Sequence, residues 1–137
     1  MDGMERFGAH PARDMSIRSM QAVEAGDRDG WLALFAPDAV VQDPVGVSPL
    51  DPSGNGHHGI DAITAFYDNV ISSGRVEFAV RESYVGGNEV ANVGTITTTL
   101  PDGMKSIVDG VFTYRVDDEG RLAAMRAFWE FDSMRFE

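Results

Sequence analysis

The sequence predicts an α+β domain in which helices come first and an antiparallel sheet follows. Apolar residues recur at helical spacing over residues 11–26 and 60–71. From Val76 onward they alternate with polar residues, as in strands that have one buried face. The turn signals PDG at 101–103 and DDEG at 117–120 divide this second half into strands. The helices are therefore expected to pack on one face of a curved sheet, with a pocket between the two layers.

The first helix is expected to begin at Pro11, where the missing N–H of proline costs nothing, and to stop at Gly26. Asp27 has the character of an N-cap for a short helix over residues 27–35, which Pro37 ends. One side of the first helix is apolar and consists of Met15, Ile17, Met20 and Val23.

Residues 39–46 are expected to form a short strand, in which Pro44 forces Asp43 toward extended geometry. Residues 46–59 are rich in Gly, Pro and Ser, and they predict a long loop that is either mobile or a lid. The next helix has an apolar face made of Ile60, Ile63, Phe66, Tyr67 and Val70. The later strands are expected at residues 76–84, 91–100, 106–116 and 121–131.

The length of 137 residues fits one domain, which we expect to span residues 11–137 after a flexible N-terminus of residues 1–10. A net charge of −11 repels phosphates and anionic lipid headgroups, so neither nucleic acid nor a membrane is an expected partner. The absence of cysteine excludes disulfides and thiolate metal sites. There is no signal-peptide pattern and no apolar run of membrane-spanning length, which predicts a cytoplasmic protein.

Three segments are similar to a known family: FAPDAVVQDPVG at 35–46, GIDAITAFYDNV at 59–70 and VFTYRVDDEGRLAAMRAFWEFD at 111–132. In this order they resemble the ketosteroid isomerase branch of the NTF2-like (SnoaL-like) superfamily, and most closely an actinobacterial isomerase-like subgroup. The resemblance covers about residues 12–132. It implies an NTF2-like cone, an apolar pocket that binds a steroid-like small molecule, and a homodimer packed through the sheets.

The resemblance also implies that Asp43 is a general base, which moves a proton between two carbons beside a carbonyl. A carboxylate flanked by Val41 and Val45 loses hydration, which raises its pKa and suits it to proton transfer near neutral pH. The alternative is a turn aspartate before proline that caps nearby backbone N–H groups.

The family's two oxyanion-hole donors fall on Ser19 and Phe112 in this sequence, and phenylalanine has no hydrogen to donate. Ser19 is expected either to donate to a ligand carbonyl or to bond its own helix backbone. The resemblance places Tyr67 at a tyrosine that supports the oxyanion hole, and its alternative is a core aromatic residue. Strand alternation puts Asp109 and Phe112 on opposite faces, so Asp109 is expected to point away from the pocket or into a dimer contact.

The pocket wall is expected to come from two neighbouring strands and the helices, although the same residues could be ordinary core. Trp129 matches a pocket tryptophan of the isomerases. The histidines His10, His57 and His58 lack a third ligand at metal spacing, so no metal and no cofactor is expected. The predicted lining residues are Val23, Phe35, Phe66, Val108, Phe112, Tyr114, Met125, Ala127 and Trp129.

Four functions remain open from the sequence. The first is an isomerase that uses Asp43 as its base, and the second is a non-catalytic protein that binds steroids or similar hydrophobic molecules. The third is a polyketide cyclase or dehydratase of the same fold, still with Asp43 as its base. The fourth is a structural or protein-binding module in which Asp43 has no chemical role.

Overall fold

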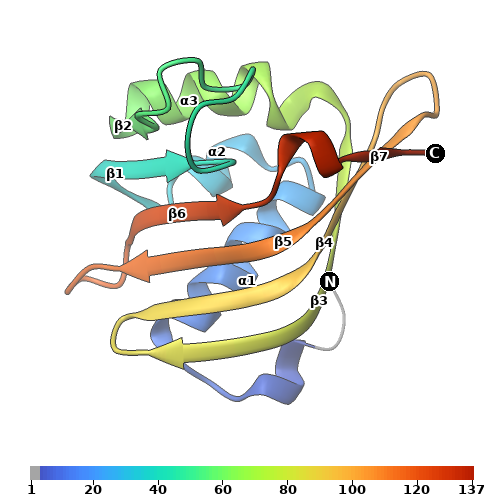
Figure 1. Ribbon diagram of the computed structural model, residues 1–137. Helices are drawn as coiled ribbons and strands as arrows, with labels where there is room; N and C mark the ends of the chain where they lie inside the picture. The colour runs from blue at the N-terminus through green and yellow to red at the C-terminus, as the bar shows by residue number, and fades with distance from the viewer. Residues whose placement is uncertain (1–3) are drawn as a thin grey trace.

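The computed structural model describes residues 4–137, which form three α-helices, three 3-10 turns and a seven-stranded sheet (Figure 1). The helical elements are η1 (Met4–Phe7), α1 (Pro11–Glu24), α2 (Arg28–Leu32), α3 (Gly59–Asn69), η2 (Ile71–Ser73) and η3 (Phe131–Ser133). The strands are β1 (Phe35–Gln42), β2 (His57–His58), β3 (Arg75–Gly86), β4 (Glu89–Thr99), β5 (Lys105–Val116), β6 (Leu122–Phe128) and β7 (Arg135–Phe136).

The sheet has the order β2-β1-β6-β5-β4-β3, and β7 pairs with β5 beside this path. Every pair is antiparallel except β1 with β6. Figure 1 shows the long strands curving in front of α1 and α2, while α3 lies along the end that β1 and β2 form. The predicted α+β arrangement, with helices on one face of a curved and mostly antiparallel sheet, is confirmed.

Local signals explain where the first helices begin and end. The His10 side chain caps α1 by accepting a hydrogen bond from the Ala12 backbone N–H, and Pro11 is the first helical residue, as predicted. Gly26 has a φ of 68°, a left-handed conformation that glycine adopts without strain, and it turns the chain toward α2. The Asp27 carboxylate accepts from the Gly30 N–H at 3.0 Å, which confirms the predicted N-cap.

Three predicted boundaries are wrong in the middle of the chain, and the strand expected at residues 39–46 is instead β1, Phe35–Gln42. The short helix ends at Leu32 rather than Phe35, because Phe35 already pairs with Leu122 in the sheet. Pro37 then lies inside β1, where the pairing with β6 shifts register and a missing N–H breaks no ladder bond. Residues 46–59 are not loop throughout, since β2 at their end pairs with β1.

Both ends of the described chain, residues 4–137, pack against the sheet. The predicted last strand, residues 121–131, ends at Phe128 and is followed by η3 and β7. Residues 1–3 of the predicted flexible N-terminus lie outside the described residues, whereas Met4 is buried and Arg6 donates to the Val80 carbonyl. The predicted domain boundary at residue 11 stays a prediction.

The core lies between the helices and the inner face of the sheet, where Trp31, Ile63 and Leu122 are fully buried. The buried Arg13 joins α1 to β3, because its guanidinium donates to the hydroxyl and the carbonyl of Ser83. Among residues 4–137 no helix is long and apolar enough to span a membrane.

Candidate active site

A cavity of about 180 Å³ lies between α1 and the inner face of the sheet. One water needs roughly 10–15 Å³ by the same measure, so this space admits a much larger molecule. Residues that alternate along β3, β4 and β5 line it, and β6 adds further ones; the apolar ones include Val76, Phe78, Ile96, Val108, Phe112 and Met125. Mostly apolar side chains therefore surround whatever binds here.

The Asp43 carboxyl forms part of the cavity wall, one residue past the end of β1. It is partly exposed, since the cavity wall is itself accessible surface, yet protein atoms enclose it. Burial raises the pKa of Asp43 to about 6, and a hydrogen bond from Trp129 opposes that increase. At neutral pH the group is thus mostly ionised and is a stronger base than an ordinary aspartate.

Trp129 reaches Asp43 because the end of β6 lies close both to the segment after Asp43 and to β5. The Trp129 indole N–H donates to Asp43 Oδ1 at 2.7 Å. The Val45 backbone N–H donates to the Ala127 carbonyl at 2.9 Å, which fastens the segment after Asp43 to β6. Gly110 on β5 permits the approach, since a Cβ at this position would collide with the Phe128 carbonyl oxygen and lie 3.0 Å from Trp129 Cβ.

A second polar group lies in the same cavity and consists of Ser19, Trp31 and Tyr114. All three side chains are buried, and they come from α1, α2 and β5. The Trp31 indole N–H donates to Ser19 Oγ at 3.0 Å, and the Ser19 hydroxyl lies beside that of Tyr114. Burial and then the negative charge of Asp43 raise the pKa of Tyr114 well above its usual value, which keeps the phenol protonated.

Most of the residues predicted for the site do line the cavity. They are Ser19, Val23, Asp43, Val108, Phe112, Tyr114, Met125, Ala127 and Trp129. The cavity lining also includes residues that the sequence analysis missed. The strand alternation contained a signal for Val76 and Ile96, whereas Leu50 and Met134 come from irregular segments without such a pattern.

Three predicted site residues lie elsewhere, outside the cavity lining. Tyr67 packs on Trp31, with ring centroids 5.5 Å apart, and Phe35 makes an edge contact with the same indole at 4.7 Å. Phe66 packs against His57. The predicted catalytic role of Tyr67 stays a prediction, and its position behind Trp31 leaves the cavity to other side chains.

Asp109 points away from the cavity. The register of β5 with β4 runs without a shift from Lys105 to Arg115, so Asp109 and Phe112 face opposite sides, as strand alternation predicted. The Asp109 carboxylate accepts hydrogen bonds from Thr95 and Arg135. The part of the chain that the structure describes brings together no three His, Cys, Asp or Glu side chains able to hold a metal ion.

Helices on one face of a curved sheet, with a carboxylate in an apolar cavity between the layers, define a class of small-molecule-binding α+β domains. Comparison with known families places the chain in such a class. The model of the SnoaL-like domain family matches residues 17–131. The chain therefore belongs to the SnoaL-like domain family, and the predicted resemblance is confirmed.

Several of the proteins to which the chain is similar have steroid-related names. The chain is 29% identical over 112 residues to the steroid Delta-isomerase of Nocardioides simplex. The matched region covers 82% of this chain and 84% of that protein. The crystal structure of Delta 5-3-ketosteroid isomerase from Mycobacterium sp. has a TM-score of 0.90 at 40% identity, covering 94% of this chain and 100% of its own. RV0760c from Mycobacterium tuberculosis in complex with estradiol-17beta-hemisuccinate has a TM-score of 0.88 at 38% identity, covering 93% and 100%.

Proposed function

We propose that this protein binds a steroid or a similar hydrophobic ketone and moves a proton beside its carbonyl, with Asp43 as the general base. The observation that supports this most directly is the Asp43 carboxyl in the cavity wall, with a pKa raised to about 6. Relatives that are steroid isomerases, and one solved with a steroid ester, support the ligand class.

In this reaction the ionised Asp43 removes a proton from the carbon next to the carbonyl, and the electron pair moves onto the carbonyl oxygen. The protonated Asp43 then returns the proton to the carbon two positions farther along. A pKa near 6 suits both proton-transfer steps, because Asp43 has to accept and then release the same proton near neutral pH. The apolar lining keeps water from competing for that proton.

A second candidate is a binding protein without catalysis, and the Phe112 side chain favours it. Phe112 lines the cavity at a position where the resemblance predicts a hydrogen-bond donor. An enolate without donors is poorly stabilised, and the loss of one donor typically costs about 100- to 1000-fold in rate.

Turnover of a 3-keto-Δ5 steroid such as androst-5-ene-3,17-dione tests the first candidate, with the conjugated product followed by its ultraviolet absorbance. We expect measurable isomerisation in the wild type and a loss of about 1000-fold in Asp43→Asn, the range that general-base removal produces. Asp109→Asn is the matched control, because this carboxylate faces away from the cavity. Equal losses in the two variants contradict a specific role for Asp43.

The same preparation separates the binding function from catalysis. Trp31 and Trp129 are the two tryptophans of the chain, and both line the cavity, so a bound steroid should quench their fluorescence in a saturable way. Saturable quenching without turnover supports the binding protein. A wild type that neither binds nor isomerises any steroid contradicts both candidates.

The predicted homodimer, the cytoplasmic location and the lack of a cofactor stay predictions. A polyketide cyclase or dehydratase function also stays a prediction. It would place Asp43 in the same role as base and would differ in the ligand that the cavity accepts.

A further inference from the structure

The Ser19 hydroxyl lies between two larger side chains, and their chemistry determines which atom donates to which. An indole N–H can only donate, so the Trp31 bond to Ser19 Oγ occupies one of the serine's lone pairs. The serine's own hydrogen stays available, and the Tyr114 oxygen beside it can accept that hydrogen. With Ser19 as its donor, the phenol keeps its own hydrogen for another acceptor.

That acceptor is not the Asp43 carboxylate. Among residues 4–137, the hydrogen-bond donor to the Asp43 side chain is Trp129, and the negative charge of Asp43 raises the pKa of Tyr114. The two groups thus line one cavity, close enough to interact electrostatically and without a direct bond. A ligand atom between them can accept from the phenol while Asp43 faces a neighbouring carbon.

We propose that Tyr114 is the residue that donates a hydrogen bond to the ligand's carbonyl oxygen, and that Ser19 and Trp31 position its hydroxyl. This inference rests on the proposed function and names the group that stabilises the enolate. It gives Tyr114 a chemical role beyond the apolar wall to which the sequence assigned it. The proposed donor therefore lies on β5, two residues after Phe112, rather than at Ser19 on α1.

The proton and electron movements balance without another reactant. Asp43 takes the proton as the C–H bond breaks, a C=C bond forms, and the carbonyl π electrons move onto oxygen, which accepts from the Tyr114 O–H. When the carbonyl re-forms, the electrons of the new C=C bond move one bond along the chain, and those of the substrate's original C=C bond take the proton from Asp43 at the far carbon. Tyr114 donates throughout without losing its proton, because burial raises its pKa well above the usual value for a phenol.

Tyr114→Phe is the direct test, since it removes one oxygen and keeps the ring in the cavity wall. We expect kcat to fall about 100-fold on androst-5-ene-3,17-dione, with a smaller change in KM, as for the loss of one oxyanion donor. Tyr84→Phe is the matched control, because Tyr84 is 61% exposed on β3 and its hydroxyl bonds Glu82. A large loss in Tyr67→Phe together with full activity in Tyr114→Phe overturns the proposal.

A spectroscopic measurement tests the same bond without turnover. The infrared carbonyl stretch of 19-nortestosterone, a 3-ketosteroid that does not isomerise further, should move to lower frequency on binding to the wild type. In Tyr114→Phe it should return to its value in an apolar solvent. Ser19→Ala should give an intermediate frequency and Ser19→Thr should restore it, because a positioning role needs only the hydroxyl.

The outcomes separate the two proposals. Turnover or ketone binding by the wild type, with an unchanged rate and carbonyl frequency in Tyr114→Phe, overturns only the role of Tyr114. Failure of the wild type to bind any 3-ketosteroid overturns the proposed function and this role together. Thermal unfolding of each variant shows whether a loss reflects an unfolded protein, and the carbonyl frequency is read only from bound ligand.

Discussion

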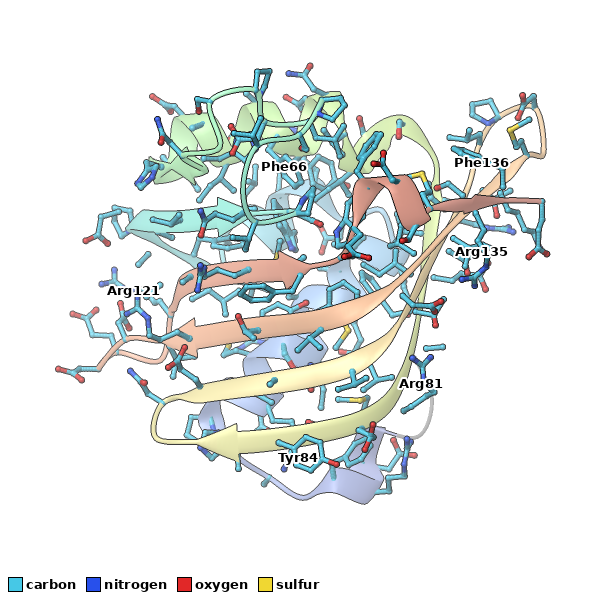
Figure 2. All side chains as sticks on the ribbon, viewed as in Figure 1. Phe66, Arg81, Tyr84, Arg121, Arg135 and Phe136 are labelled. Atoms are coloured by element: carbon cyan, nitrogen blue, oxygen red, sulfur yellow. The ribbon has the colours of Figure 1, made fainter. Side chains whose placement is uncertain are left out.

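Asp43 and Asp109 are two aspartates on opposite sides of one sheet, and their surroundings give them opposite acid–base properties. On the outer face, hydrogen bonds from Thr95 and Arg135 hold the pKa of Asp109 below its usual value. On the inner face, burial raises the pKa of Asp43 to about 6. Figure 2 shows Arg135 and Arg81 among the side chains of the outer face. The face of the sheet, and not the residue type, decides which carboxylate can exchange a proton near neutral pH.

The number of partners differs as much as the burial does. Both oxygens of Asp109 accept hydrogen bonds, and Arg81 adds a further bond to Thr95. Trp129 bonds only Oδ1 of Asp43, and Oδ2 has no protein partner among residues 4–137. A base acts most readily through an oxygen without a hydrogen-bond partner, and within residues 4–137 Oδ2 of Asp43 is such an oxygen, whereas both oxygens of Asp109 are bonded.

The largest effect that this comparison predicts is the pH dependence of turnover. Below the pKa of about 6, kcat/KM should fall about tenfold per pH unit because Asp43 is protonated, and above it the rate should level off. Rates on a 3-keto-Δ5 steroid between pH 4 and 8 measure this profile. The profile of Asp109→Asn should coincide with that of the wild type. A midpoint near 4 in the wild type would mean that water solvates Asp43 freely.

The next effect is on stability, and its sign distinguishes the two carboxylates. Because the folded-state pKa of Asp43 is raised, the folded protein holds this proton more tightly than the unfolded chain between about pH 4 and 6. The wild type therefore loses stability as pH rises through that window, by roughly 1–3 kcal/mol after allowance for partial exposure. Asp43→Asn should be more stable than the wild type by that amount at pH 8.

Urea unfolding of both proteins at pH 4 and pH 8 measures this difference. At pH 4 the two should have similar stabilities, because Asp43 is already protonated in the folded wild type. Asp43→Asn that is less stable than the wild type at pH 8 would show that the carboxylate stabilises the fold, as the alternative of a turn aspartate requires.

The sequence predicted which face of the sheet each strand residue occupies better than it predicted contacts between distant segments. Period-two alternation placed Val108, Phe112 and Tyr114 on one side of β5 and Asp109 on the other, because alternation depends only on local backbone geometry. The family resemblance assigned Asp43 its proposed role, and the raised pKa gives it a physical basis.

Contacts between distant segments had no such local signal. The bond from Trp31 to Ser19 and the contact of Ser19 with Tyr114 join three elements, and no spacing within one segment indicates them. For the same reason Tyr67 was a natural candidate on α3, although Trp31 lies between it and the cavity. A helical pattern predicts which face is buried, but it does not predict which buried residue reaches a cavity.

A smaller effect is expected from Trp129→Phe, which removes the only hydrogen bond that a side chain within residues 4–137 gives to Asp43. That bond lowers the pKa of Asp43, so its loss should raise the pKa above about 6. The midpoint of the kcat/KM profile should move to higher pH. Only the midpoint tests this prediction, because replacing a residue of the cavity wall can also change the plateau rate. An unmoved or lowered midpoint contradicts the geometry of the Asp43–Trp129 pair.

The smallest effect is expected on the outer face, where Asp109→Asn removes an exposed ion pair. Arg135 Nη1 lies 2.6 Å from the Asp109 carboxylate, with both side chains about half exposed, and solvent screening leaves such pairs little net effect on stability. Because the pKa of Asp109 is lowered, its contribution is present above the unfolded pKa of about 3.8 and is lost as pH falls. Asp109→Asn should thus be slightly less stable than the wild type at pH 8, opposite in sign to Asp43→Asn, and 1 M salt should shrink the difference. If Asp109→Asn is instead more stable than the wild type, removing a carboxylate has the same effect on both faces of the sheet. The difference in surroundings would then not explain why only Asp43 suits proton transfer.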